Sequence, residues 1–412
     1  MSKEYKIMYL CCYLCFWGAI ISSCASHITN AYPSPALYDL DVLYDMKNNS
    51  HNYPQLADFF KEADSIALLS PVSVMSKRKT FAPNKHFYCS ISRYSWPVGS
   101  DSAGRYKIID GKCNPEYADF DGATLESLAH RLQCLSVAFF LTNNHTYKVA
   151  FEDQIKCWFI VRRTRMLPNF EYAHVLPGSN HNMGQVYGLA ELSRFTKIIE
   201  SILLYNNVVG IGDTEKRKLT DWFTDFQRWL ICSDQWNYIY NDNHNNITSS
   251  SFMAMVEISM ITQNIKLIEK LYQVYGKQVI DAQIDAHGRQ PTELSRSAGF
   301  GYSVENLHEI VDFCIVMEKM DFPLYKNYKL KIDAAFCYLK QFVNNHERFP
   351  YSQNAPWKLY EERLQKDIIR LLKLTNKHYV NLNQCSTTNT WNSSTILLSL
   401  IHISEPTRLG MI

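Results

Sequence analysis

The stretch DGATLESLAHRLQCLSVAFF, residues 121–140, decides the fold class of this chain. Its apolar side chains recur at intervals of three and four residues, at Leu125, Leu128, Leu132, Leu135 and Phe139. That spacing places them on one face of an α-helix. Asp121 can cap the start of this helix, because its carboxylate can accept a free backbone N–H there.

A second apolar stripe of the same kind lies between residues 213 and 230, with Asp213 and Thr214 as candidate caps. Its members are Leu219, Trp222, Phe223, Phe226, Trp229 and Leu230. Further helical stretches cover about 190–205, 251–276, 303–319, 329–344 and 358–374. No alternating run predicts strands of comparable strength, and no repeat of fixed period predicts a regular solenoid. Helices joined by loops indicate an all-α domain.

The N-terminus has the pattern of a secretory signal peptide, assigned to residues 1–31. Lys3 and Lys6 form a basic start, residues 7–21 are apolar, and small residues follow. A membrane anchor is the alternative, but the apolar run is shorter than the roughly 20 residues that a spanning helix needs. We therefore expect a secreted protein, extracellular or periplasmic if bacterial, that has no membrane attachment once the signal is removed.

The rest of the chain divides into three parts. Residues 32–80 form an N-terminal segment whose start is polar and loose, and residues 81–375 form the main domain. Residues 81–121 lack helical period, and irregular loops of this length are usually functional or disordered. Residues 376–412 form a C-terminal tail, and its last dozen residues resemble a translated sequencing adapter more than protein.

Composition narrows the function classes. The 412-residue chain is 46% apolar, enough for a large core, and its formal net charge of +2 argues against a nucleic-acid partner. Beyond the signal there is no CxxC pair and no HExxH motif, so no metal site is expected. The cysteines of the mature chain permit disulfides or buried thiols. Glycosylation sequons begin at Asn48, Asn144, Asn246 and Asn392.

Two segments combine cations with aromatic residues. KHFYCSISRYSWP, residues 85–97, lies in the irregular region; aromatic faces stack on sugar rings, and cations bind carboxylates. WFIVRRTRMLPNFEYAHVLPG, residues 158–178, reads as a helix that ends in arginines and breaks at Pro168. The arginines fit a solvated charge run at a helix C-terminus. The polar and aromatic residues that follow them also allow a cleft wall.

Two further segments carry titratable side chains in loops. NDNHNNIT, residues 241–248, places Asn243 and His244 in a polar loop made of ordinary loop formers. HGRQPTELSRSAGFGYS, residues 287–303, places Arg296 and Tyr302 near a helix predicted to begin at Ser303. A helix N-terminus and a guanidinium both favour a phenolate, which a tyrosine base requires. An N-cap with a neighbouring aromatic residue is the simpler interpretation.

In this order, the four segments and IDGKCNPE at 109–116 resemble the alginate lyase family of polysaccharide lyases. The resemblance runs from about Phe81 to Leu339. It implies an (α/α) toroid, an incomplete α/α barrel of helical hairpins around a cleft. It also implies a lyase that cuts a uronate-containing polysaccharide by β-elimination, with no metal or organic cofactor. The expected partner is an acidic polysaccharide, and the expected state is a monomer.

The resemblance also implies site residues. Asn243, His244 and Arg296 match the residues that neutralise the substrate carboxylate, which is electrostatic stabilisation of developing charge. Tyr302 matches the tyrosine that takes the C5 proton and donates one to the leaving oxygen, and His244 could share the base role. Candidates for binding neighbouring sugars are Lys85, His86, Tyr94, Trp96, Arg165, Asn169 and Tyr172.

The chain departs from the family pattern in ways that leave alternatives open. An ungapped match places Ile247 at the family histidine position, whereas a shift of about three residues places His244 there. The family usually carries Asn where Leu167 stands and Gln where His174 stands, which favours a substrate other than alginate or lost activity. A catalytically inactive carbohydrate-binding relative is therefore an alternative. A hydrolase using carboxylates such as Glu116, Asp119 and Asp121 is a third hypothesis.

Overall fold

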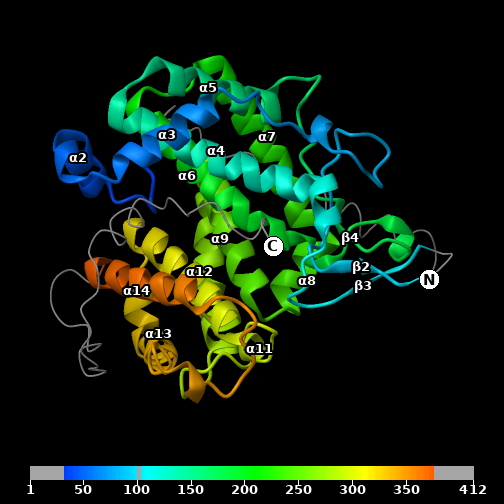
Figure 1. Ribbon diagram of the computed structural model, residues 1–412, viewed down its shortest axis with the longest axis vertical. Helices are drawn as coiled ribbons and strands as arrows, with labels where there is room; N and C mark the ends of the chain where they lie inside the picture. The colour runs from blue at the N-terminus through cyan, green and yellow to red at the C-terminus, as the bar shows by residue number, and fades with distance from the viewer. Residues whose placement is uncertain (1–31, 100–103, 375–412) are drawn as a thin grey trace, which may run out of the picture. The chain divides into compact units, whose positions relative to one another are not determined.

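The computed structural model describes residues 32–99 and 104–374 (Figure 1). The predicted signal peptide and C-terminal tail lie outside the described residues, as do Cys385 and Asn392. Within the described part, α-helices dominate and the strands are three or four residues long, so the all-α prediction is confirmed.

The helices and strands follow one another along residues 33–374, which belong to one compact unit. The helices are α2 (Leu40–Asn48), α3 (Leu56–Ala67), α4 (Asp121–Thr142), α5 (His145–Ile155), α6 (Ser193–Val208), α7 (Asp213–Cys232), α8 (Asp234–Asn241), α9 (Asn246–Ile261), α10 (Ile265–Tyr275), α11 (Pro291–Leu294), α12 (Gly299–Lys319), α13 (Leu324–Lys340) and α14 (Trp357–Leu374). The strands are β1 (Cys89–Ile91), β2 (Ser95–Pro97), β3 (Tyr106–Ile108) and β4 (Tyr172–Val175).

Four helices form the centre of the unit. α4, α6, α9 and α12 pack against one another in chain order (Figure 1). α9 is buried from Thr248 to Ile261, which requires apolar or small side chains all round rather than on one stripe. The remaining helices pack outside these four: α3 and α5 on α4, α7 and α10 on α9, and α13 and α14 on α12. Helical hairpins therefore surround a helical centre.

The predicted apolar stripe of α7 is buried, apart from the half-buried Trp229. Trp222 lies at its middle, with its ring edge-on to Phe159 at 4.8 Å between centroids. Its indole Nε1 donates to the Met166 carbonyl at 2.8 Å. This bond ties the outer helix to the loop that follows the arginine run, so α7 helps to position that loop.

Carboxylates also lie within the core. Glu200 of α6 accepts the backbone N–H groups of Ala36 and Leu37 at 2.8 and 2.7 Å, which fixes the N-terminal segment to the centre. Glu257 of α9 is fully buried. Burial raises the pKa of Glu200 to about 7 and raises that of Glu257 well above its usual value, so both are held toward the neutral form.

Local predictions differ from the structure at several helix ends. Asp121 does not cap α4, because its carboxylate is bound instead by the ammonium of Lys77 and the N–H of Cys89. α7 begins at Asp213, and Gly212 takes the cap position. The stretch 251–276 is broken, because Gln263 has a left-handed backbone and Asn264 caps α10 by accepting the Leu267 N–H.

Other differences concern where helices begin. α12 starts four residues before Ser303, because the Tyr302 N–H already bonds to the Ala298 carbonyl at 2.9 Å. The polar stretch before Pro54 contains α2, whose buried Leu43 and Met46 contribute to the core. The arginine run follows a helical segment that ends at Ile160, rather than lying within it.

Two further observations concern the described residues. Their cysteines are all free thiols: Cys89, Cys113, Cys134, Cys157, Cys232, Cys314 and Cys337. None of the helices among them has the length and apolarity that crossing a bilayer would take.

Candidate functional site

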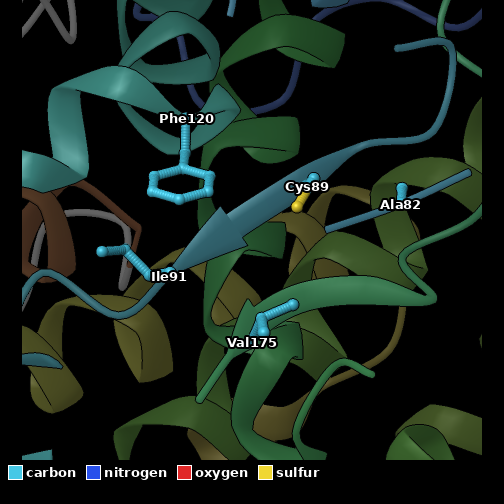
Figure 2. Close-up of a cluster of buried hydrophobic side chains, with 5 residues drawn as sticks. All are labelled: Ala82, Cys89, Ile91, Phe120 and Val175. Atoms are coloured by element: carbon cyan, nitrogen blue, oxygen red, sulfur yellow. The ribbon is translucent and has the colours of Figure 1, made fainter. Parts of the chain in front are cut away.

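The segment 85–97 is paired with the segment that follows the arginine run. β1 and β4 form a parallel pair in which Cys89 faces Tyr172 and Ile91 faces Val175. A small buried cluster packs around β1, made of Ala82, Cys89, Ile91, Phe120 and Val175 (Figure 2). The two segments, which are far apart in the sequence, therefore form one structural unit.

A buried lysine anchors the same segment. The Lys77 ammonium donates to the carbonyls of Lys85 and Phe87, both at 2.8 Å, and to the Asp121 carboxylate at 2.5 Å. The side chains of Lys77 and Asp121 are fully buried. Three N–H groups are thus matched by three oxygens, which leaves no donor of the ammonium unsatisfied.

The predicted sugar-binding residues fall into two sets. His86, Arg165 and Tyr172 lie on the β1–β4 unit: the His86 Nδ1 lies 2.9 Å from the Arg165 carbonyl, and the Tyr172 ring lies edge-on to Phe87. The Arg165 side chain is exposed, and Lys85 and Asn169 are partly exposed on the same unit. Tyr94 and Trp96 lie beyond β1, where β2 pairs antiparallel with β3.

Trp96 fixes the loop that follows β3. Its Nε1 donates to the Lys112 carbonyl at 2.8 Å, and the Lys112 ammonium lies 4.6 Å from the centre of its ring. The Ile109 N–H donates to the Tyr94 carbonyl at 2.9 Å. These contacts hold the 109–116 loop against the segment 85–97, and they place Asp110 next to the candidate catalytic residues.

Tyr94, Asp110, Arg296 and Tyr302 form a connected set, called here the tyrosine–arginine group. The hydroxyls of Tyr94 and Tyr302 are 2.9 Å apart. The Arg296 guanidinium stacks on the Tyr302 ring at 3.9 Å from its centre. Its Nη2 and Nε donate to the two carboxylate oxygens of Asp110 at 2.7 and 3.2 Å, and the Ser297 N–H adds a third bond at 3.0 Å.

Electrostatics in the group set the charge of each member. Burial opposes the Asp110 carboxylate, but the bonds from Arg296 and Ser297 outweigh it and lower the pKa of Asp110 to about 2. Burial raises the pKa of Tyr302 well above its usual value, and the neighbouring Arg296 opposes this rise only in part. Burial likewise raises the pKa of Tyr94. At neutral pH the group therefore contains two phenols and an ion pair, and the phenolate expected from the sequence is not its resting form.

Arg296 keeps free binding capacity. A guanidinium has five N–H donors, and Asp110 occupies two of them. The remaining N–H groups can donate to a second carboxylate or to a hydroxyl oxygen, with the stacked phenol alongside. This arrangement can neutralise an acidic group and supply a proton beside it.

Asn243 and His244 lie in the loop between α8 and α9. Asn243 is buried, and its amide donates to Asn245 Oδ1 and Thr248 Oγ1 at 2.7 and 2.8 Å, which shapes the loop. His244 is exposed. Within the described residues, neither side chain hydrogen bonds to Arg296 or Tyr302. Of the four predicted catalytic residues, the structure brings Arg296 and Tyr302 into direct contact. The loop that carries Asn243 and His244 is attached to the Arg296 segment through a bridge at the start of α9, and that bridge involves neither of their side chains.

That bridge is Glu293. Its carboxylate accepts the Asn246 N–H at 2.7 Å, so the start of α9 is attached to the segment that carries Arg296. Ile247 lies in the first turn of α9, half-buried, one residue beyond the bridged position. Burial raises the pKa of Glu293 to about 7. His244 thus lies in the loop before the helix, and Ile247 lies in the helix itself.

His174 lies in β4 and connects the β1–β4 unit to Ser90 and Glu191. Its backbone has a φ of +52°, a region that few side chains adopt, and its N–H donates to Ser90 Oγ at 3.0 Å. Its Nε2 lies 3.1 Å from the buried carboxylate of Glu191. Burial opposes that charge, but His174 and nearby arginines outweigh it and lower the pKa of Glu191 to about 2. The histidine therefore pairs with an internal anion.

Asp110, Glu293 and Glu191 have contacts that the sequence pattern did not predict. Asp110 lies in the quoted IDGKCNPE segment, so a signal existed, but its partner Arg296 is 186 positions away. Glu293 lies in the quoted 287–303 segment, three residues before Arg296. Their functions depend on contacts between distant segments, which a linear pattern does not show.

The carboxylates considered for hydrolysis are engaged in ion pairs. Glu116 accepts from Lys79 at 2.6 Å and from the Tyr106 hydroxyl. Asp119 pairs with Arg78, and Asp121 with Lys77. Each carboxylate is already neutralised by a neighbouring cation, which does not favour an acid–base pair across a glycosidic bond.

Comparisons with known proteins agree with this architecture. The family model described as alginate lyase matches residues 73–349. The crystal structure of an alginate lyase from Bacteroides ovatus at 1.60 Å resolution superposes with a TM-score of 0.78 at 25% identity, covering 84% of this chain and 93% of that chain. No curated protein matches. The structural match confirms the α/α toroid predicted from the sequence.

Proposed function

Because this chain belongs to the alginate lyase family, we propose that it is a polysaccharide lyase that cleaves a uronate-containing polysaccharide, alginate or similar, by β-elimination. The observation that carries the proposal is the tyrosine–arginine group. A stacked guanidinium with free donors and a protonated phenol lie side by side, and both chemical needs of the reaction are met there.

The reaction removes the proton on C5, next to the uronate carboxylate, and expels the 4-linked sugar. A double bond forms between C4 and C5, and the leaving oxygen takes a proton. Arg296 neutralises the carboxylate so that negative charge can develop on C5. Asp110 holds Arg296 in place while leaving donors free. Asn243 and His244 are proposed to complete the neutralisation when substrate bridges the cleft.

Tyr302 is proposed to transfer the proton. Its raised pKa keeps a proton on the phenol at neutral pH, which suits donation to the leaving oxygen. Abstraction of the C5 proton by the same residue needs the phenolate, which binding beside Arg296 favours. His244 is the second candidate base, with its exposed ring in the loop before α9. Lys85, His86, Tyr94, Trp96, Arg165, Asn169 and Tyr172 are proposed to bind neighbouring sugars.

The test is a substrate panel of alginate, glucuronan and glycosaminoglycans, read by the ultraviolet absorbance of the unsaturated product. Tyr302→Phe removes only the hydroxyl, so we expect a loss of about 10²- to 10⁴-fold in kcat with the fold intact. Tyr44→Phe is the matched control, because Tyr44 is an exposed tyrosine on α2. Full activity in Tyr302→Phe would refute the role of the phenol.

The same panel addresses the alternative. Binding of oligouronates without absorbance on any polymer would favour a catalytically inactive carbohydrate-binding relative. Activity that survives His244→Ala but not Tyr302→Phe would assign both proton transfers to the tyrosine. Loss in both would support a shared role.

Secretion is also proposed, and the basic and apolar pattern of residues 1–31 supports it. Among the described sequons, Asn48 and Asn144 are exposed and suit glycans. Asn246 suits one less, because its amide oxygen is buried and Thr248 is bonded to Asn243. Expression in a secreting host, followed by N-terminal sequencing and glycopeptide mass spectrometry of the medium, tests both points. A monomer is proposed and is tested by light scattering.

A further inference from the structure

Three potential metal ligands meet between α3 and α4, outside the tyrosine–arginine group. The His130 Nε2 lies 2.9 Å from Glu62 Oε1, and the Cys134 Sγ lies 3.7 Å from the same nitrogen. One donor atom from each residue lies within 4.8 Å of the other two. The Cys134 Sγ also lies 3.9 Å from the other ring nitrogen of His130, Nδ1. Carboxylate, imidazole and thiol are therefore close enough for one cation to reach all three after small side-chain movements.

Local structure explains the meeting. His130 and Cys134 are four positions apart on α4, so their side chains lie on the same face one turn apart. Glu62 projects from α3, which packs on α4. Neither helix has a CxxC or HExxH motif, so the pattern is visible only when the two helices are placed together.

We propose that Glu62, His130 and Cys134 bind a divalent zinc-like cation, with water as a fourth ligand. Zinc prefers this mixture of nitrogen, sulfur and oxygen donors, in tetrahedral geometry. Bonds of about 2.0 to 2.3 Å place donor atoms roughly 3.3 to 3.8 Å apart. The nitrogen–sulfur separation already fits, and the Glu62 carboxylate needs to retreat by a few tenths of an ångström.

Burial around the three residues fits an open site with one protected ligand. Cys134 is fully buried, whereas the side chains of His130 and Glu62 are 23% and 35% exposed. A cation and its water ligand can therefore reach the site from the solvent side. Binding replaces the thiol proton, which is released to solvent, and the thiolate becomes a ligand.

The site would fasten the N-terminal segment to the toroid. Glu62 belongs to the segment 32–80, and the other two ligands belong to the central helix α4. Existing bonds already link these parts, including Tyr147 to Asp64 and Arg131 to the Ser70 carbonyl. The cation adds a link that depends on its concentration, so the role is structural and independent of the proposed lyase chemistry.

The experiment uses the full-length protein, stripped of metal by a chelator and titrated with Co²⁺. We expect a thiolate-to-cobalt absorption band in the near ultraviolet that saturates at one equivalent. Cys134→Ser should abolish the band, and Glu62→Gln should weaken Co²⁺ binding at least tenfold. Cys232→Ser is the matched control, because Cys232 is an exposed cysteine on α7 and its loss should leave the band unchanged.

Zinc provides a second readout. Zn²⁺ should raise the Tm of the wild type and of Cys232→Ser but not of Cys134→Ser, with far-ultraviolet circular dichroism confirming that each variant is folded. If Cys134→Ser does not fold, Glu62→Gln carries the comparison. No cobalt band in the wild type, or a band that persists in Cys134→Ser, would overturn the proposal and leave a hydrogen-bonded histidine beside a buried thiol. Lyase activity is measured in parallel and should not depend on added metal.

Discussion

Lys77→Met should be among the most damaging single substitutions in the segment that leads to β1. It removes the cation that is bonded to the buried Asp121 carboxylate and leaves the carbonyls of Lys85 and Phe87 without this donor. Burial raises the pKa of Asp121 to about 7 and lowers that of Lys77, so the pair persists against a substantial desolvation cost. Removing one partner of such a pair costs about 3 to 5 kcal/mol.

This cost converts into a measurable shift. For a cooperative unit of roughly 340 residues, an unfolding entropy of about 2.1 cal/mol/K per residue turns 3 to 5 kcal/mol into about 4 to 7 °C of Tm. Guanidinium unfolding followed by circular dichroism should give the same order of free energy. The exposed pair Lys61–Asp58 is the control, since Lys61→Met removes an ion pair that is largely in solvent and should leave Tm unchanged within error.

A double-mutant cycle sharpens the test. Asp121→Asn alone should also be strongly destabilising, because it leaves the ammonium buried without a counter-ion. Lys77→Met with Asp121→Asn should cost clearly less than the sum of the two, since no unpaired charge remains. Strictly additive costs, or a single-mutant cost below about 1 kcal/mol, would refute the view that this buried pair organises the segment.

Three further predictions follow from other contacts. Asp110→Asn frees Arg296 to move, so kcat should fall by about 10²-fold with little change in Tm. An unchanged kcat would show that Asp110 is not needed to hold Arg296 in place. Burial raises the pKa of Glu257 in the folded protein, so this group stabilises the fold fully below its unfolded pKa near 4.5, and the stabilisation is lost as pH rises. Glu257→Gln should therefore flatten the fall in unfolding free energy between pH 5 and 8, and an unaltered pH profile would contradict this prediction. Trp222→Phe leaves the Met166 carbonyl without its donor and should cost about 1 to 3 kcal/mol in denaturant unfolding, whereas a neutral effect would show that the bond is dispensable.

The helical architecture could be predicted because its signal is local. The stripe from Leu125 to Phe139 contains enough apolar side chains at helical spacing to require burial, and α4 is buried along those positions. Helix ends were less predictable. Asp121 has the carboxylate that a helix cap needs, but this carboxylate binds the Lys77 ammonium, 44 positions earlier in the chain, instead of the helix N-terminus.

The candidate site was likewise predictable only in part. Arg296 and Tyr302 are close in sequence, and their stacking agrees with the prediction that they act together. The charge state of Tyr302 was not predictable, because burial among distant segments raises its pKa by more than the Arg296 guanidinium lowers it. Asn243 and His244 remain predictions, since their position relative to a substrate depends on a ligand that bridges the loops.

The bonds that complete the tyrosine–arginine group join residues 186 and 208 positions apart. During synthesis the ribosome releases Tyr94 and Asp110 long before Arg296 and Tyr302, and N-terminal parts of a chain fold first. A nascent or truncated chain that ends before α12 lacks the Tyr302 phenol. Under the roles proposed for Arg296 and Tyr302, catalytic competence is therefore gained only after α12 has been made and has packed on α9.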